Sequence, residues 1–516
     1  MKKSIYLSLV ASTVIILSGC GGGGSGSGSS GSSSVSLKVS AGADRLVRMN
    51  TPVRVIGGSN KAGTSYQWSE GGTNISGANS KVLVYIPSTP GIHTLKLTAT
   101  NGSETKTDTV KLTVSPTAPN YRNLLVVRIN FSDTQFQNGA SVWASKIFGN
   151  SNGELNNYYK EVSNGKLQFL PATESDGVQD GIVDVTLSQN HPADDSSDTS
   201  YRFWNVFKNA ISQIDSKVDF SSYDSNSDGT IDAQELQIVF LVSGGETSTG
   251  WNPSNSVWGL MSCYSSPTTP SAPTQDGVTL MKCSDGGDFA RFGERHKAFG
   301  GGSHDATIGI IAHELGHAAF GLPDLYDIDG ATGGIGMFGL MGAGSWARAT
   351  ASQKPGQTPV HMTAWSKIQA GFATPTVISA TTAATLHGTD KNNYNIYQVN
   401  TSTTGEYYLV ENRPNSGYDQ GLHSLNNGST FAGGLLVMHV DENMADNSGN
   451  PHRLVDIEEA SSPELDNTSG SNRGAVGNLF YGTNVGTLSA PYSGGTAPSI
   501  TSVSAPGEPM TATITP

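Results

Sequence analysis

The sequence HELGH, residues 313–317, places two histidines and a glutamate where they could bind and use a metal ion. Residues four apart on a helix project from the same face, so the imidazoles of His313 and His317 could reach one tetrahedral zinc ion. Glu314 would stand near the metal without binding it. There it could take a proton from a metal-activated water and pass it to the leaving amine. The spacing therefore predicts zinc-dependent hydrolysis of peptide bonds without a covalent intermediate.

A third ligand must come from the chain that follows this helix. Gly321 is expected to end the helix, because glycine tolerates the left-handed conformation of a C-cap, and Pro323 blocks its continuation. The chain must then turn back toward the metal. We predict that Asp324 is the third zinc ligand, with Asp327 and His361 as the alternatives.

Two segments are expected to hold these residues in place. The sequence TIGIIAHELGH predicts a helix whose residues Ile311, Leu315 and Ala318 lie on another face, suited to packing inward. Downstream, GMFGLMGAGSW places Met341 in a glycine-rich turn that could pass beneath the metal.

A calcium site is predicted by DSNSDGTIDAQE, residues 224–235, which follows the pattern of the EF-hand loop. Gly229 would make its sharp turn. The following LQIVFLVSGG reads as a strand, so we expect an isolated loop with a structural calcium ion and no paired helix-loop-helix sensor. A solvated acidic turn is the alternative. The expected ligands are Asp224, Asn226, Asp228, Thr230 through its carbonyl, and Glu235.

The rest of the sequence predicts three domains, an ordinary number for 516 residues. Short alternating runs over 36–116 predict an immunoglobulin-like β-sandwich with Trp68 in its core, serving as a spacer or as a substrate-binding module. Residues 121–372 combine the buried-strand signal NLLVVRINFSD with helix candidates, so we expect an α/β or α+β catalytic domain. Residues 373–516 predict a β-rich C-terminal domain.

The N-terminus has the features of an export signal. Residues 1–20 carry two lysines, an apolar run and the sequence LSGC, which resembles a bacterial lipoprotein signal cut before Cys20. An ordinary cleaved signal is the alternative. Residues 21–35 should form a flexible Gly/Ser tether. We expect a protein outside the cytoplasm, anchored by a lipid on Cys20 to a bacterial membrane (outer membrane or cell surface) or released to the medium.

Cysteine and charge restrict the remaining possibilities. In an oxidising compartment the pair Cys263 and Cys283 most simply forms a disulfide, which would stabilise the fold by about 3 kcal/mol. Two free thiols or two further metal ligands are the alternatives. The formal net charge of −13 argues against nucleic acid as a partner, because such binding needs clustered Lys and Arg. We expect a monomer that acts on protein or peptide substrates.

Several longer stretches are similar to the immune inhibitor A family of bacterial zinc metalloproteases. The similarity extends over most of residues 121–515. Its motifs are HELGHAAFGLPDLYD, the turn around Met341, PVHMTAWSKIQAGF, NYYKEVSNGKLQF, EYYLVENRPNSGYDQGL, GGLLVMHVDEN and LVDIEEA. In addition, STPGIHTLKLTATNG resembles PKD-type domains, which are common on bacterial secreted enzymes.

The resemblance implies a metzincin-like endopeptidase. It assigns zinc binding to His313 and His317, the role of base to Glu314, and a place under the site to Met341. In the family the aspartate of GLPD stands ten positions after the first histidine, whereas here it comes one later, as if Phe320 were inserted. The alternative function is a cell-surface adhesion or binding protein that keeps the peptidase scaffold without its chemistry.

Overall fold

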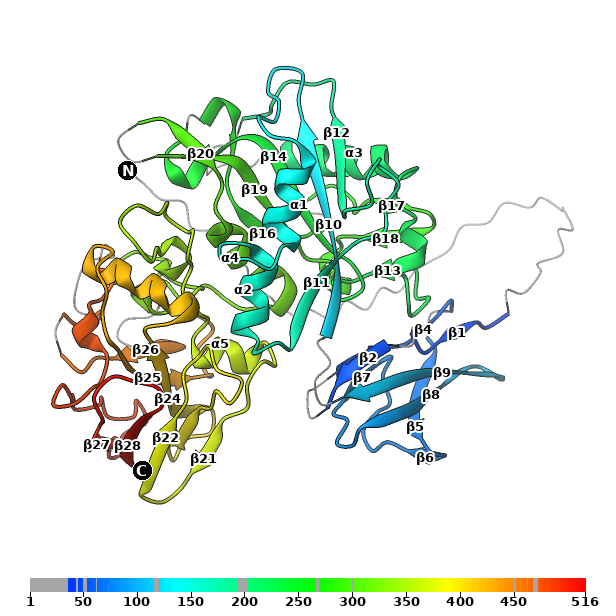
Figure 1. The fold of residues 1–516 in the computed structure, drawn as a ribbon. Helices are drawn as coiled ribbons and strands as arrows, with labels where there is room; N and C mark the ends of the chain where they lie inside the picture. The colour runs from blue at the N-terminus through cyan, green and yellow to red at the C-terminus, as the bar shows by residue number, and fades with distance from the viewer. Residues whose placement is uncertain are drawn as a thin grey trace, which may run out of the picture.

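The computed structural model describes most of the chain beyond the predicted tether. The described residues are 36–516 except 43–44, 50–52, 62, 116–119, 194–201, 252, 266–268, 299–300, 449–451, 462 and 467–471. The predicted signal with Cys20 and the tether therefore lie outside the described residues. The architecture is mixed α/β, rich in strands and poor in helices (Figure 1). This agrees with the fold class expected from the sequence at the level of α/β and β-rich regions.

Residues 36–115 form what we call the N-terminal β region. A five-stranded sheet in the order β2-β9-β8-β5-β6 and the pair β3-β7 contribute to one core, where Trp68 is fully buried. The indole N–H of Trp68 donates to the carbonyl of Ser80, at 3.1 Å, which satisfies its polar atom. The strands are β1 (Val39–Ser40), β2 (Arg45–Arg48), β3 (Val53–Ile56), β4 (Gly58–Ser59), β5 (Ser65–Glu70), β6 (Thr73–Asn74), β7 (Val82–Tyr85), β8 (Gly91–Asn101) and β9 (Glu104–Ser115).

An eight-stranded sheet forms the centre of the molecule, in the order β11-β10-β14-β19-β16 with β12, β15 and β20 at its margins. Its strand pairs are parallel except those of β19 with β16 and β20. Every residue of β14 is buried, as expected for an inner parallel strand. The strands are β10 (Asn120–Asn130), β11 (Leu167–Pro171), β12 (Ile182–Thr186), β14 (Gln237–Glu246), β15 (Ser256–Val257), β16 (Leu260–Ser262), β19 (Phe289–Lys297) and β20 (Ser303–Asp305).

Helices pack on both faces of this sheet. Leu124 and Val126 of β10 share a core with α1 (Ala140–Phe148), α2 (Leu155–Val162) and α4 (Ile308–Phe320), whereas Leu125 and Val127 share one with α3 (Arg202–Ile214). The alternation of side chains along a strand thus separates the two layers of helices. Among the described residues, none of the helices has the length and apolar character needed to cross a membrane.

The C-terminal region follows the short helix α5 (Ala364–Gln369) and is built from strands. A five-stranded sheet runs β21-β23-β24-β25-β26 and a three-stranded sheet runs β22-β28-β27. Leu409 and Met438 from this region belong to the same core as Leu315 of α4, so the two regions support each other. The strands are β21 (Thr376–Ile378), β22 (Thr382–Leu386), β23 (Tyr397–Asn400), β24 (Glu406–Pro414), β25 (Gly433–Asp441), β26 (Val455–Glu458), β27 (Ser499–Thr501) and β28 (Met510–Thr515).

The predicted disulfide between Cys263 and Cys283 is confirmed, with a Cα–Cα distance of 5.0 Å. Cys263 directly follows the edge strand β16, and Cys283 lies in the segment that leads into β19. The backbone N–H of Cys283 also donates to the carbonyl of Tyr264, at 3.1 Å. The disulfide therefore fastens one edge of the central sheet.

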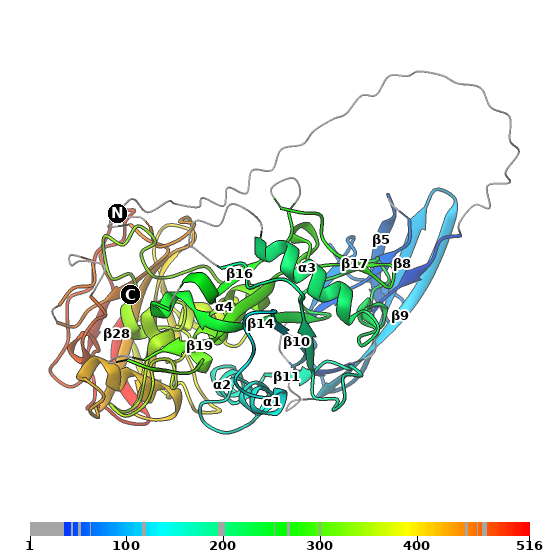
Figure 2. The same cartoon turned by 90° about the horizontal axis from the view of Figure 1, so that it is seen from above.

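The N-terminal β region lies at the end of the molecule opposite the C-terminal region (Figure 2) and contacts the loop at 224–235. The hydroxyl of Ser40 donates to the carbonyl of Ser225, at 2.8 Å. The ammonium group of Lys81 lies 2.6 Å from a carboxylate oxygen of Asp228. The contact therefore joins segments that are far apart in the sequence.

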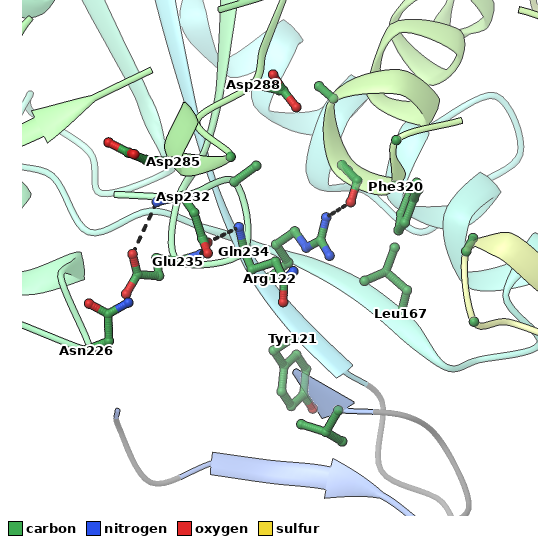
Figure 3. Close-up of a pocket in the computed structure, with 18 of the residues that line it drawn as sticks. Tyr121, Arg122, Leu167, Asn226, Asp232, Gln234, Glu235, Asp285, Asp288 and Phe320 are labelled. Carbon is green, nitrogen blue, oxygen red and sulfur yellow. Dashed lines mark hydrogen bonds between the residues drawn. The ribbon is translucent and has the colours of Figure 1, made fainter. Parts of the chain in front are cut away.

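The fit at this contact is close. A β-carbon on Gly58 would lie 2.5 Å from the backbone oxygen of Asn226, so a side chain there would push the two parts apart. A cavity of about 670 Å³ opens beside the contact, with residues of both parts in its walls (Figure 3). Arg122 in this wall donates to the carbonyl of Ala319 at the end of α4, at 2.5 Å. The cavity therefore reaches the C-terminal end of the helix that carries the HELGH motif, where Ala318, Ala319 and Phe320 line it.

Candidate functional site

Helix α4 carries the HELGH motif and ends where the sequence predicts. Gly321 adopts the left-handed conformation, with φ of 67°, and its N–H donates to the carbonyl of His317, at 2.8 Å. The backbone then turns through Pro323 and brings Asp324 back alongside the helix. A glycine cap and a short turn thus absorb the extra residue between the histidines and this aspartate.

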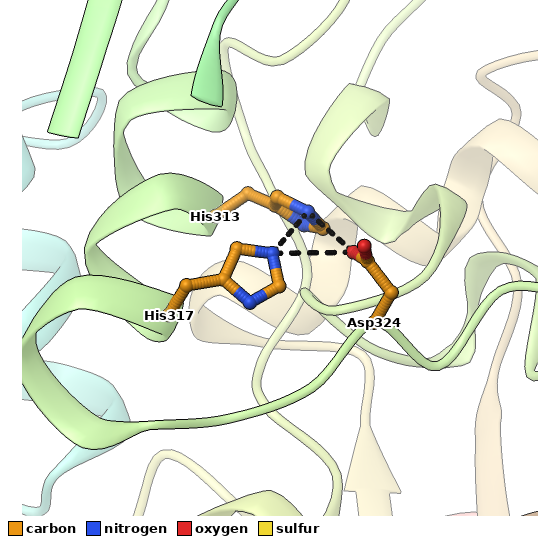
Figure 4. Close-up of side chains that lie close together, drawn as sticks. All are labelled: His313, His317 and Asp324. Atoms are coloured by element: carbon orange, nitrogen blue, oxygen red, sulfur yellow. Dashed lines mark hydrogen bonds and ion pairs between the residues drawn. The ribbon is translucent and has the colours of Figure 1, made fainter. Parts of the chain in front are cut away.

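The side chains of His313, His317 and Asp324 converge on one point (Figure 4). One carboxylate oxygen of Asp324 lies 3.0 Å from Nε2 of His313 and 3.2 Å from Nε2 of His317. The two Nε2 atoms are 3.1 Å apart. Among the residues that the structure describes, this is the one group of three or more His, Cys, Asp or Glu side chains with ligand atoms within 4.8 Å of one another.

The other ring nitrogen of each histidine is held by the backbone. Nδ1 of His313 lies 2.9 Å from the carbonyl of Leu340, and Nδ1 of His317 lies 2.5 Å from the carbonyl of Leu322. A carbonyl oxygen only accepts, so each Nδ1 carries a proton and donates it. In the neutral imidazole the lone pair is then on Nε2, which faces the convergence point, as a metal ligand requires.

The alternative third ligands lie outside the cluster and have other partners. The carboxylate of Asp327 accepts hydrogen bonds from the N–H and the hydroxyl of Thr332, at 2.9 and 2.8 Å. The fully buried His361 pairs with Glu161 at 2.8 Å. The geometry therefore favours Asp324 as the carboxylate of the cluster.

The charges of the cluster stabilise one another. Burial alone would lower the pKa of His313, but the hydrogen bond with Asp324 and the charge of Glu314 raise this pKa to about 9. Burial likewise works to raise the pKa of Asp324, yet the bonds to the two imidazoles hold it well below its usual range. Asp324 therefore keeps its negative charge in a largely buried site, where a cation would be attracted.

Met341 lies against the helix at the turn between the two histidines. A β-carbon on Gly316 would come within 2.6 Å of the sulfur of Met341, so a larger residue there would displace the Met341 side chain. The carbonyl of Met341 accepts a hydrogen bond from the N–H of Leu325, at 2.9 Å. The Met341 turn therefore joins the helix to the loop that carries Asp324.

A cleft of about 340 Å³ opens onto this cluster, and both His313 and Glu314 line it. The carboxylate of Glu314 is 7 % exposed and accepts a hydrogen bond from the backbone N–H of Met261 on β16. Burial raises its pKa above the usual value for a glutamate. Glu314 thus reaches the space where a bound peptide and a water molecule would meet the metal.

Tyr326 is a part of the site that the sequence did not reveal. Its hydroxyl donates to the second carboxylate oxygen of Asp324, at 2.9 Å, and its ring lies within 19° of parallel to that of His313. The hydrogen bond fixes the orientation of Asp324. The sequence shows a tyrosine two residues after the proposed ligand. Without the geometry of the turn, the sequence does not predict that this tyrosine contacts Asp324.

We expect Tyr326→Phe to weaken zinc binding by about 10- to 100-fold, the usual cost of losing a partner that orients a metal ligand. Competition with a chromophoric chelator would measure this loss, and Tyr121→Phe, at an exposed site remote from the cluster, is the control. Equal zinc affinities of the Tyr326→Phe variant and the parent would show that the hydroxyl does not orient Asp324.

The loop at 224–235, for which the sequence predicts a calcium site, turns at Gly229 and is held by backbone hydrogen bonds. Gly229 has a φ of +80°, and its N–H donates to Asp224 at 3.0 Å. The side-chain oxygens of Asn226 and Asp228 accept from the N–H groups of Asp228 and Thr230, each at 2.9 Å. In the structure, backbone amides thus hold the oxygens of the proposed ligands in place.

The two ends of this loop are also as expected. It begins after the 3-10 helix η1 (Phe220–Tyr223) and leads into β14, so it is not part of a helix-loop-helix pair. Glu235 accepts a hydrogen bond from the N–H of Ser225, at 3.0 Å, which closes the loop on itself. Burial and the neighbouring charge of Asp232 raise the pKa of Glu235 to about 8. The carboxylates of this loop are less closely gathered than the histidine cluster.

Comparison with solved structures gives only weak matches. A titin M4 domain is 18 % identical over 15 % of this chain and 95 % of its own, with a TM-score of 0.14. A sialyltransferase from Photobacterium damsela is 11 % identical over 41 % of this chain and 38 % of its own, with a TM-score of 0.13. TM-scores this low give no information about the fold or the function of this chain. No curated protein sequence matches the chain.

A family model gives the informative match. The model described as "Immune inhibitor A peptidase M6, catalytic domain" matches residues 130–373, which contain helix α4, the histidine cluster and the Met341 turn. This supports the resemblance stated from the sequence motifs. The chain is therefore a peptidase of the metalloprotease class, with a catalytic region similar to that of the immune inhibitor A family.

Proposed function

We propose that the protein is a zinc-dependent endopeptidase that cleaves proteins outside the cytoplasm. The observation that carries the proposal is the convergence of His313, His317 and Asp324 next to a cleft that His313 and Glu314 line, within the region that matches the peptidase family. The wider match makes the inactive binding protein the less favoured reading, since the proposed ligands and the base are all present.

The donor set fits a catalytic zinc ion. Two imidazole nitrogens and one carboxylate oxygen are three protein ligands, which leaves a fourth tetrahedral position for water or substrate. The hydrogen bonds from Nδ1 to backbone carbonyls, together with that of Tyr326 to Asp324, orient all three ligands. A zinc ion held there would supply Lewis acidity, which makes water easier to deprotonate and a carbonyl easier to attack.

The protein side chains would carry the proton transfers. Glu314 would accept a proton from the attacking water and then donate it to the nitrogen of the leaving amine. The Met261 N–H that bonds to its carboxylate would hold Glu314 toward the cleft. The products would be two peptides, one with a new carboxylate and one with a new amine.

Metal removal tests the proposal. We expect the purified chain to cleave unfolded casein, and 1,10-phenanthroline to stop the cleavage because it removes zinc from the cluster. Added zinc should restore the activity. Cleavage that continues in protein shown by mass spectrometry to be free of metal would contradict a zinc mechanism.

We further propose that the loop at 224–235 binds a structural calcium ion. The support is its EF-hand-like sequence and its closed shape, with Gly229 at the turn. Adding EGTA should lower the thermal stability of the chain, because a ligand at 100 times its Kd stabilises by about 2.7 kcal/mol. Calcium added in excess of the EGTA should restore the stability of the parent but not that of an Asp224→Asn variant. An unchanged melting temperature of the parent on EGTA addition would refute the calcium site.

The location of the protein is proposed from the sequence. A lipid on Cys20 would anchor the chain to a bacterial membrane, with residues 21–35 as a tether to the N-terminal β region. We propose that the anchored protein is a monomer. Membrane fractionation of a Cys20→Ser variant tests the anchor, since the variant should appear in the soluble fraction.

A further inference from the structure

Large apolar side chains form part of the wall of the active-site cleft. Trp258, Tyr326 and Ile328 line it and are exposed, at 40, 39 and 42 %. Trp346 lines the same cleft from the turn after Met341. Exposed apolar side chains gathered around a catalytic group indicate a binding surface for apolar parts of a substrate.

The lining of the cleft also contains one basic residue. Arg473 lines the cleft and is exposed, and it is the one Lys or Arg among the lining residues. It comes from the C-terminal region, beyond the residues 130–373 that match the peptidase family. The C-terminal region therefore contributes to the wall of the catalytic cleft.

The backbone at Arg473 is fixed at this place. Its carbonyl accepts a hydrogen bond from the N–H of Met337, at 2.9 Å, and the next N–H, of Gly474, donates to the side chain of Asn472 at 3.0 Å. Gly336 allows this contact, because a β-carbon there would lie 2.7 Å from the Arg473 carbonyl. Arg473 is thus fixed by its backbone to the segment that precedes Met341.

The side chain of Arg473 is exposed, and its guanidinium has no hydrogen bond or ion pair within the described part of the chain. Apart from Glu314, the carboxylate that lines the cleft is that of Asp327. Asp327 is 5 % exposed, and its two oxygens accept hydrogen bonds from the N–H groups of Asp329 and Thr332. The protein has a net charge of −13, yet among the described residues this arginine has no carboxylate partner of its own. Its guanidinium is therefore available to bind an anionic group of a ligand.

We propose that Arg473 determines substrate specificity by binding a carboxylate of the peptide, while the apolar wall takes a large apolar side chain. The inference rests on the proposed endopeptidase function and adds to it the class of substrate. The carboxylate belongs either to an Asp or Glu side chain near the cleaved bond or to the C-terminus of a short peptide. Both sources offer the planar pair of oxygens that a guanidinium binds.

Quenched fluorescent peptides would test this proposal. Each contains one Phe and, at a flanking position, Asp, Glu, Asn, Gln or Lys, and each is made with a free or an amidated C-terminus. We expect kcat/KM of the zinc-loaded parent to be about 10- to 100-fold higher for peptides with the recognised carboxylate than for their neutral analogues. Amidation removes this preference only if the C-terminus is the recognised group.

Substitution of Arg473 provides the second comparison. Arg473→Gln should reduce the preference for the carboxylate to less than threefold, and Arg473→Glu should favour the Lys peptides. Lys354→Gln removes an exposed positive charge elsewhere and should keep the preference of the parent. Equal losses of kcat/KM for acidic and neutral peptides in Arg473→Gln, or a parent without preference, would overturn the proposal.

A binding measurement separates this inference from the proposed function. Fluorescence anisotropy with the zinc-loaded Glu314→Gln variant records peptide affinity without turnover. If this variant binds acidic peptides more tightly than neutral ones, and the added substitution Arg473→Gln removes the difference, the inference is supported. It is supported even if the parent cleaves no peptide, because that result would contradict only the peptidase function. Equal affinity for acidic and neutral peptides would overturn the role of Arg473.

Discussion

Replacing Glu314 by glutamine is expected to lower kcat/KM for peptide cleavage by about 100- to 10,000-fold, the usual contribution of a general acid–base group. The amide keeps the size of the side chain but cannot accept a proton from the attacking water. Glu314 is not one of the three side chains whose ligand atoms converge, so the variant should still bind one zinc ion per chain. Peptide kinetics together with elemental analysis would measure both quantities.

The control for this substitution is Glu442→Gln, which changes a carboxylate that bonds to Gln369 and Tyr407 away from the cleft. It should leave both quantities near those of the parent. If Glu314→Gln cleaved peptides at more than a tenth of the parent rate, another group would have to act as the base.

Asp324→Ala should release the metal. The substitution removes one of three ligands and leaves His313 and His317 without their negative partner, so zinc affinity should fall by more than the roughly 10- to 100-fold that an orienting partner contributes. After dialysis against a weak chelator, we expect less than a tenth of the parent's zinc content and a matching loss of activity. Circular dichroism would verify that α4 remains folded.

Two further variants decide between the candidate third ligands. Asp327→Ala and His361→Ala should keep their zinc under the same dialysis, because Asp327 bonds to Thr332 and His361 to Glu161. Full retention of zinc by Asp324→Ala, with loss in one of the other two, would assign the ligand to that residue instead.

Local sequence signals predicted much of the catalytic helix. The apolar spacing of TIGIIAHELGH placed the helix, and Gly321 and Pro323 placed its end, because these signals depend only on neighbouring residues. The strands β10 and β14 likewise follow from the short apolar runs NLLVVRINFSD and LQIVFLVSGG. The disulfide between Cys263 and Cys283 could be predicted because these are the two cysteines that follow the predicted signal sequence.

The remaining features depend on contacts between distant residues. Arg473 reaches the cleft through a backbone contact with Met337, and Lys81 reaches Asp228 over a separation of 147 residues. No short window of sequence contains such a pair. The role of Tyr326 became visible only once the turn after α4 placed its hydroxyl on Asp324.

The close fit of the N-terminal β region to the loop at 224–235 has a consequence for the lifetime of the enzyme. An endopeptidase must resist autolysis, and a proteolytic cut requires that a segment detach and extend into the cleft of another copy. Lys81, Ser40 and the close approach of Gly58 hold this loop against a neighbouring sheet. If the protein is the endopeptidase proposed above, cleavage of this loop by another copy would require the two parts to separate first, so the contact would slow autolysis there.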